Sequence, residues 1–170
     1  MLSRVGCGYP NRLEGKTHMQ SREFLESVAE AYFSPHDNCP GRIVRLFADA
    51  QSSVDVCVFT ITDDRISSAI LAAHARGLAT RIITDNDKAR DAGSDVHRLA
   101  AFGVPVRIDR SPFHMHHKFA IFDRRVLVHG SYNWTRGAAR DNLESIVVTN
   151  EPRLVSAFER EFERLWTLFT

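Results

Sequence analysis

Apolar positions along the chain follow two different spacings, and their alternation predicts strands separated by helices. Short apolar runs rich in β-branched residues predict strands at residues 31–33, 54–61, 81–84, 104–108, 119–122, 126–128 and 143–149. Apolar residues at helical spacing predict helices from about Ser21, from Pro40, from Asp63 or Asp64, over Ser94–Phe102 and from Glu151–Pro152 onward. The alternation predicts an α/β fold, with a mixed, largely parallel β-sheet flanked by helices on both faces.

Helix-capping residues support these boundaries. Pro40 suits the first turn of its helix, and Asp63 or Asp64 suits the N-cap of the next one. Gly77 stands where that helix should end. Residues 1–20 mix Gly, Pro and Asn and are expected to form an N-terminal arm, so residues 21–170 are predicted to form a single domain.

Composition and charge exclude several classes of protein. The formal net charge of +1 predicts no strong non-specific attraction to polyanions, so a nucleic-acid function would need a local basic groove. The chain has no apolar run long enough to span a bilayer, and its first residues lack the apolar core of a secretory signal. The three cysteines suggest no disulfide framework. We therefore expect a soluble, cytoplasmic protein.

The chemistry is concentrated in one stretch with the pattern H-x-K-x4-D-x6-G-S-x-N, from His116 to Asn133. His116 and Lys118 are two residues apart on a predicted strand, so their side chains should share a face. The polar residues 123–125 predict a hairpin turn, which would return Ser131 and Asn133 to the same end of the sheet. An imidazole, an ammonium, a hydroxyl and an amide at one place are suited to bind and attack a phosphate.

The pattern resembles the HKD signature of the phospholipase D superfamily of phosphodiesterases. Glu144 stands where that family usually carries an acidic residue that supports the histidine. A basic hairpin with surface histidines is the alternative, but it explains neither the G-S-x-N at its offset nor this glutamate. Further segments are similar to the mitochondrial phospholipase D or Zucchini-type branch, namely Ala31–Pro35, Ser53–Phe59, Arg81–Asp85, Met115–Ile121 and Gly130–Thr135. The similarity covers roughly residues 31–168 and implies a phospholipase D-like α-β-α sandwich.

The resemblance and the chemistry together assign roles to these residues. His116 is the expected nucleophile and would form a phosphohistidine intermediate, while Lys118 and Asn133 bind the non-bridging oxygens. Ser131 adds a donor, and Glu144 is expected to orient the imidazole. No carboxylate cluster suited to a magnesium pair is apparent, so we expect catalysis without metal or other cofactors.

Asp123 belongs to the signature, yet it is five residues from Lys118 and therefore has the wrong parity for the same face of the strand. We expect it to serve as a structural hydrogen-bond partner.

Cleavage of a phosphodiester needs a nucleophile and a proton donor on opposite sides of phosphorus. The chain has a single H-x-K pattern, and His117 should point to the opposite face from His116. His114 shares the parity of His116 but is too near to act from the far side. The simplest solution is a two-fold homodimer that brings two copies of His116 into one composite active site. Enzymes of the family with a single motif are built in this way.

The substrate is open between two classes of phosphodiester. The Zucchini-type branch is associated with single-stranded RNA endonuclease activity and with cardiolipin hydrolysis, and bacterial single-motif nucleases share its core. The sequence shows neither the membrane anchor nor the zinc-binding insertion of that branch, which favours an endonuclease on single-stranded nucleic acid over a phospholipid hydrolase. A catalytically idle binding module is the third alternative. Candidate substrate-binding residues are Arg110, His114, Trp134 and Arg136.

Two further features carry weaker hypotheses. A basic groove could also include Lys88, Arg90 and Arg140, with Phe113 beside Trp134 as base-stacking platforms. A zinc site could be assembled from His36, Cys39, and Cys7 or His18, but their spacing fits no standard motif, so a solvent-exposed loop is preferred at residues 36–40.

Overall fold

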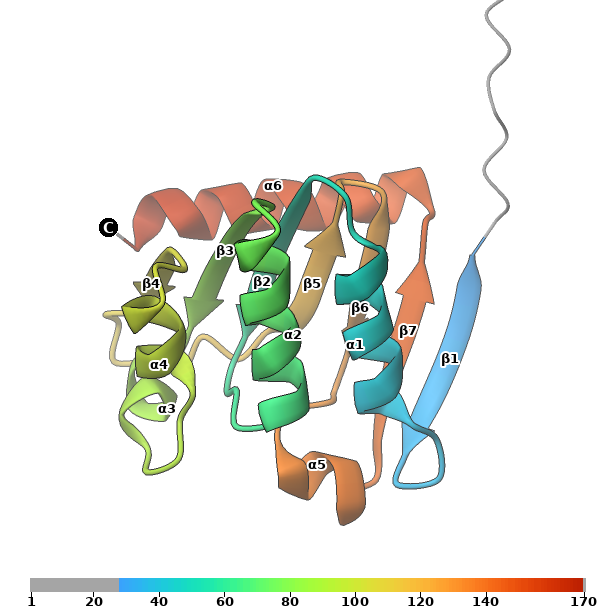
Figure 1. Cartoon of the computed structure of the whole chain (residues 1–170), viewed down its shortest axis with the longest axis horizontal. Coiled ribbons are helices and arrows are strands. Elements are labelled where there is room, and N and C mark those ends of the chain that lie inside the picture. The colour runs from blue at the N-terminus through green and yellow to red at the C-terminus, as the bar shows by residue number, and fades with distance from the viewer. Residues whose placement is uncertain (1–27, 170) are drawn as a thin grey trace, which may run out of the picture.

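A computed structural model describes residues 28–169, and within them seven strands form one mixed sheet (Figure 1). The strands are β1 (Ala29–Ser34), β2 (Ser53–Val58), β3 (Ala79–Thr84), β4 (Val106–Ile108), β5 (Lys118–Phe122), β6 (Val126–Gly130) and β7 (Glu144–Thr149). The helices are α1 (Cys39–Asp49), α2 (Asp64–Ala75), α3 (Asn86–Arg90), α4 (Val96–Ala101), α5 (Arg136–Arg140) and α6 (Pro152–Leu168). The helix expected from Ser21 lies outside the described residues.

The strand order is β1-β7-β6-β5-β2-β3-β4. Only the pairs β2–β3 and β3–β4 are parallel, and the four other pairings are antiparallel. The prediction of a largely parallel sheet was therefore wrong, although the sheet is mixed as expected. The reason is that the hairpin β5–β6 docks against β2 in the reverse direction, and β7 and β1 then extend the antiparallel half.

Helices cover both faces of the sheet, which confirms the predicted α-β-α sandwich (Figure 1). Alternating residues of β2 show the two faces: Val56 packs in the larger core with α1 and α2, whereas Cys57 packs in the smaller core beneath α6. In α6, Phe162 and Leu165 are buried as predicted. Leu154, an apolar residue in the first turn of this helix, is instead 43% exposed.

Most predicted helix boundaries are confirmed. Pro40 lies in the first turn of α1, with Asn38 as the N-cap. Asp63 caps α2 by accepting a hydrogen bond from the Arg65 N–H, and Gly77 follows the helix with φ +87°. The helices α3 and α5 have five residues each and were not predicted, because so short a segment shows no apolar periodicity.

The predicted hairpin turn after Phe122 is confirmed. Asp123 and Arg124 adopt φ angles of +53° and +55°, which suit the tight turns that join antiparallel strands. The turn returns β6 along β5, with Phe119 paired to His129. None of the helices in the described range 28–169 is long and apolar enough to cross a membrane.

Candidate active site

Most residues of the signature, but not Asp123, lie where β5 begins and β6 ends, at the lower edge of the sheet in Figure 1. Antiparallel pairing explains this: the segment before β5 and the end of β6 lie at the same edge, where β7 begins. The strands β1, β2 and β3 also end there. Loops from the parallel part of the sheet and from its antiparallel part therefore lie at this edge.

His116 and Lys118 lie against the same aromatic ring, that of Phe59 at the end of β2. The ring of His116 lies 4.5 Å from the Phe59 ring, centre to centre, and the Lys118 Nζ lies 4.8 Å from the centre of the same ring. Lys118 Nζ also donates a hydrogen bond of 2.7 Å to the carbonyl oxygen of His116. His117 instead contacts Phe119 and lies 3.6 Å from Glu161 of α6. The two histidines thus contact different aromatic rings, although both line a hollow beside α6 with His114 and Glu161, so their opposite orientation stays a prediction.

The electrostatics of the site favour an uncharged imidazole. Burial, followed by the positive charge of Lys118, lowers the pKa of His116 below its ordinary value. Burial also lowers the pKa of Lys118, and the carboxylates of Glu144 and Asp85 oppose that effect. Because His116 is itself exposed, its neutral imidazole can reach a substrate at neutral pH.

The segment Gly130–Asn133 is fixed by its pairing with the start of β7. A Cβ atom at Gly130 would lie 2.1 Å from the backbone oxygen of Ser145, so only glycine permits this approach. Ser131 donates its N–H to that oxygen, and its hydroxyl accepts a hydrogen bond from the Ser145 N–H. The side-chain oxygen of Asn133 is buried and has no hydrogen-bond partner among the described residues. This oxygen can only accept hydrogen bonds, so any contact of Asn133 with a phosphate would have to come from its Nδ2 hydrogens.

Glu144 begins β7, which in the strand order is separated from β2 by β6 and β5. Its carboxylate accepts a hydrogen bond from Asn142 Nδ2, and its charge acts on Lys118. In the described part of the chain no hydrogen bond joins it to His116. Glu144 also lines a hollow of about 300 Å³ with Ser131, Phe33 and Leu143.

The structure does not bring Asp123 to this group. It lies at the opposite end of β5, where its carboxylate accepts hydrogen bonds from the N–H groups of Gln51, Ser52 and Ser53. Burial would raise its pKa, but these hydrogen bonds outweigh burial and leave the pKa lowered. Its contacts are those of a structural partner that holds the hairpin turn against the start of β2.

The candidate substrate-binding residues lie in different environments. Trp134 is only 2% exposed and packs edge-to-face on Phe47, so the prediction of a base-stacking surface there was wrong. It belongs to the larger core, on the side of the sheet covered by α1 and α2. Arg136 is exposed but forms an ion pair with Asp64. Arg110 is exposed near the end of β4.

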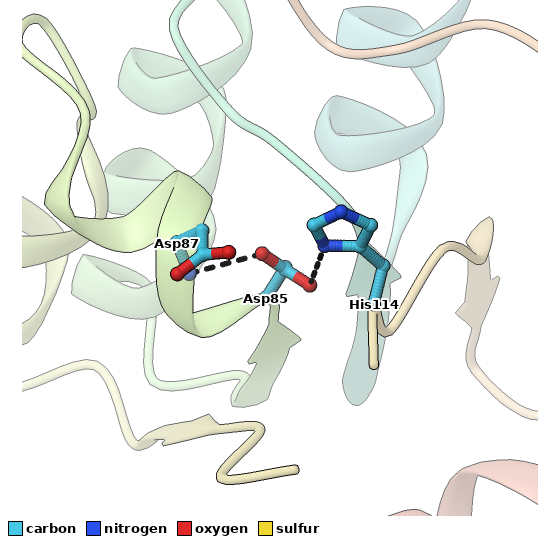
Figure 2. A group of neighbouring side chains, drawn as sticks. All are labelled: Asp85, Asp87 and His114. Atoms are coloured by element: carbon cyan, nitrogen blue, oxygen red, sulfur yellow. Dashed lines mark hydrogen bonds and ion pairs between the residues drawn. The ribbon is translucent and has the colours of Figure 1, made fainter. Parts of the chain in front are cut away.

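His114 is held by Asp85, at the end of β3 (Figure 2). Asp85, Asp87 and His114 each place a possible ligand atom within 4.8 Å of the others. Both oxygens of Asp85 are already used, because Oδ1 accepts from two N–H groups of α3 and Oδ2 accepts from Met115 N–H and pairs with His114 Nδ1. This arrangement fits a capping carboxylate better than a cation site.

The zinc hypothesis finds no support among the residues described. Cys39 is fully buried at the start of α1, and His36 lies on the exposed loop before it. Cys7 and His18 lie outside the described residues.

Sequence reasoning missed Phe59 and Asp85 as parts of this site. Both directly follow strands that end at the same edge, β2 and β3. That position was a usable signal, since groups just beyond the carboxyl ends of neighbouring parallel strands meet at one edge.

Comparisons with known proteins agree with this geometry. Residues 43–166 match the family described as "Cardiolipin synthase, PLD-like domain". Over 128 residues the chain is 44% identical to a mitochondrial cardiolipin hydrolase of Chlamydomonas reinhardtii, covering 75% of this chain and 57% of that protein. The human mitochondrial cardiolipin hydrolase is 39% identical over 136 residues, or 79% of this chain and 54% of that protein. The chain thus spans little more than half the length of these relatives.

Solved structures show the same fold. Nuc of Salmonella typhimurium, described as a phospholipase D family member, superposes with a TM-score of 0.78 at 27% identity, covering 84% of this chain and 95% of that one. NucT of Helicobacter pylori gives a TM-score of 0.77 at 19% identity, with 84% and 97% coverage.

Proposed function

The chain belongs to the phospholipase D superfamily, and we propose that it is a phosphodiesterase whose substrate is a phospholipid of the cardiolipin type. The observation that carries this proposal is an exposed apolar rim beside the catalytic group. Phe33 is 57% exposed and Leu143 is 86% exposed, and both line the hollow that contains Ser131 and Glu144. Exposed apolar side chains around a site allow it to enter the boundary between lipid headgroups and acyl chains.

The charges around the site give less support to a nucleic-acid groove. Three of the basic residues considered for such a groove have acidic neighbours: Lys88 pairs with Asp91, Arg136 with Asp64 and Arg140 with Asp141. These pairs reduce the positive field that would attract a polyanion. The two relatives described above are both named mitochondrial cardiolipin hydrolase, which also favours a phospholipid substrate. We therefore place the phospholipid before single-stranded nucleic acid, the reverse of the order expected from the sequence.

In the proposed mechanism, the neutral imidazole of His116 attacks phosphorus in line and forms a phosphohistidine. The bond from phosphorus to the leaving glycerol oxygen breaks, and that oxygen takes a proton from a general acid. Water then attacks phosphorus, gives a proton to the same group, and releases His116 and a phosphatidate. With cardiolipin the other product is phosphatidylglycerol. Lys118, Asn133 and Ser131 bind the non-bridging oxygens, whose charge they stabilise in the transition state.

The general acid is proposed to be His116 of a second copy of the chain. His116 is exposed at the edge of the sheet, so a two-fold related copy can approach it from the open side. His117 is less suited to this role because it follows His116 directly in the chain and its Nε2 lies 3.6 Å from Glu161 Oε1 of α6. We therefore propose a homodimer with one composite active site.

Cleavage of single-stranded nucleic acid is the second candidate. It is favoured by the likeness to Salmonella Nuc over nearly the whole length of that protein. The same imidazole and ammonium would serve either diester, so the surroundings of the site decide between them.

The test is to incubate cardiolipin vesicles and labelled single-stranded DNA and RNA with the wild type, His116→Ala and His117→Ala, all in EDTA. We expect phosphatidate release by the wild type and His117→Ala, and none by His116→Ala. Cleaved oligonucleotides beside intact lipid would instead establish the second candidate. Activity abolished by EDTA would contradict a mechanism carried by these side chains alone.

A further inference from the structure

We propose that Asp85 is a positioning residue of the active site, which fixes the segment carrying His116 through hydrogen bonds to His114 and Met115. This inference rests on the proposed role of His116. It assigns a function to a buried carboxylate that directly follows β3, far in the sequence from the residues of the H-x-K pattern.

The two oxygens of Asp85 have separate partners. Oδ1 accepts hydrogen bonds of 3.0 and 3.2 Å from the N–H groups of Asp87 and Lys88, and so caps α3. Oδ2 lies 3.0 Å from the N–H of Met115 and 3.2 Å from Nδ1 of His114 (Figure 2). One rigid side chain therefore ties α3 to the segment that enters β5.

Capping alone does not account for this arrangement. The helix α3 has only five residues, and its cap needs a single acceptor oxygen. Asp85 is fully buried, and burial of a carboxylate is costly unless its hydrogen bonds are complete. The second oxygen completes them by binding the backbone one residue before His116, which restricts where that imidazole can lie.

The ring of Phe59 adds a second restraint on the same segment. The rings of His114 and His116 both pack edge-on against it, at 5.4 and 4.5 Å between ring centres. With Asp85 holding His114 and Met115, His116 is confined between a fixed backbone and a fixed ring. Misplacement by about 1 Å can reduce a catalysed rate by roughly 100-fold, so such a restraint has a measurable effect.

The charge of Asp85 also reaches the nucleophile. It raises the pKa of His116 and so opposes burial and the charge of Lys118, which lower it. The groups near His116 come from several elements. Phe59 follows β2 and Asp85 follows β3, while His114, His117 and Lys118 belong to its own segment. Asp109, after β4, and Glu161 and Arg164 of α6 line the same hollow of about 240 Å³ as His116. Removing the Asp85 charge should therefore lower the pKa of His116 further.

The experiment compares Asp85→Asn with the wild type in two measurements: the pH dependence of hydrolysis and the NMR titration of the His116 ring. We expect kcat to fall by roughly 10- to 100-fold, with KM close to the wild-type value. Both the midpoint of the His116 titration and the acidic limb of the rate profile should move to lower pH. Asp85→Glu, which keeps the charge but displaces the carboxylate, should lower kcat and leave the midpoint closer to that of the wild type.

Asp63→Asn is the matched control, because Asp63 is also a buried N-cap at this edge but binds Arg65 and not the catalytic segment. It should change neither the midpoint nor kcat. The proposal is overturned if Asp85→Asn leaves both quantities at their wild-type values, or if Asp63→Asn changes them equally. If Asp85→Asn does not fold, Asp85→Glu tests the proposal: a lowered kcat supports it, and a kcat equal to that of the wild type overturns it. If the wild type cleaves neither lipid nor nucleic acid, the proposed function fails, while the NMR midpoints still test Asp85.

Discussion

The two ends of β5 hold parts of the same signature in opposite electrostatic conditions. At one end Lys118 is 9% exposed, and no carboxylate of the described residues forms an ion pair with it. At the other end Asp123 accepts several hydrogen bonds from backbone N–H groups. Both pKa values are lowered, which disfavours the charge of the base and favours the charge of the acid. At the Lys118 end, the buried positive charge lowers the stability of the fold but is placed where it can bind a phosphate. At the Asp123 end, the hydrogen-bonded carboxylate stabilises the fold.

Replacement of the nucleophile should have the largest effect. In His116→Ala the rate of hydrolysis should fall by about 10,000-fold or more, because the covalent route is lost. The unfolding free energy should change little, since the side chain is exposed. Steady-state kinetics and urea unfolding check this, with His117→Ala as the neighbouring control. If His116→Ala were fully active, His116 would not be the nucleophile, and the contrast between the two ends of β5 would no longer hold.

Lys118→Met should lower kcat by roughly 100- to 1,000-fold, because a fixed cation on the phosphoryl oxygens is lost. The variant should nevertheless be at least as stable as the wild type at pH 7. Since the folded-state pKa of Lys118 is lowered, the unfolded chain binds the proton more tightly, and the wild type gains stability as pH rises through that pKa. Chemical denaturation between pH 7 and 10 measures this gain, which Lys118→Met should not show. If Lys118→Met were less stable than the wild type, burial of the Lys118 charge would not lower the stability of the fold as proposed.

Asp123→Asn should do the reverse, with an unfolding free energy lowered by about 1–3 kcal/mol and kcat per folded molecule retained. The pKa of Asp123 is lowered on folding, so its stabilisation is present above the ordinary value of 3.8 and is lost as pH falls through the folded-state pKa. Urea unfolding from pH 6 down to acid should show this loss in the wild type and a weaker one in the variant. A large loss of kcat would instead assign Asp123 to the site.

The smallest effect is expected at the apolar rim. Leu143→Ser should weaken action on cardiolipin vesicles by about 1 kcal/mol, or roughly fivefold in kcat/KM, because less apolar surface enters the bilayer. Hydrolysis of a soluble, short-chain phosphodiester should be unchanged. Vesicle and soluble-substrate assays run side by side test this, and an equal loss on both substrates would assign Leu143 to the chemistry and not to lipid contact.

Local rules were sufficient for part of the fold and of the site. The caps at Pro40 and Asp63, the turn at Asp123, and the shared side of His116 and Lys118 follow from spacing and from side-chain chemistry over a few residues. Each depends on a neighbour close in sequence, so the sequence alone contains the information.

Features that depend on strand order could not be predicted in this way. The antiparallel docking of β5 on β2 brings Val58 beside Lys118, and no local pattern specifies that pairing. The places of Phe59 and Asp85 next to His116 follow from it. Trp134 was misassigned for a similar reason: an aromatic residue in a polar loop shows its burial only once Phe47 of α1 is known to lie beneath it.

The pairing of β1 with β7 has a consequence for synthesis on the ribosome. Ala29 pairs with Thr149, so the first described strand finds its partner only after residues up to Thr149 have emerged. Until β7 has emerged, the backbone N–H and C=O groups of β1 have no neighbouring strand to pair with. Nascent chains in this condition bind chaperones or associate wrongly. Ser34 of β1 also binds the carbonyl of Asn142, next to Glu144. Enzymatic activity should therefore be among the last properties that a newly made molecule acquires, after most of its helices have formed.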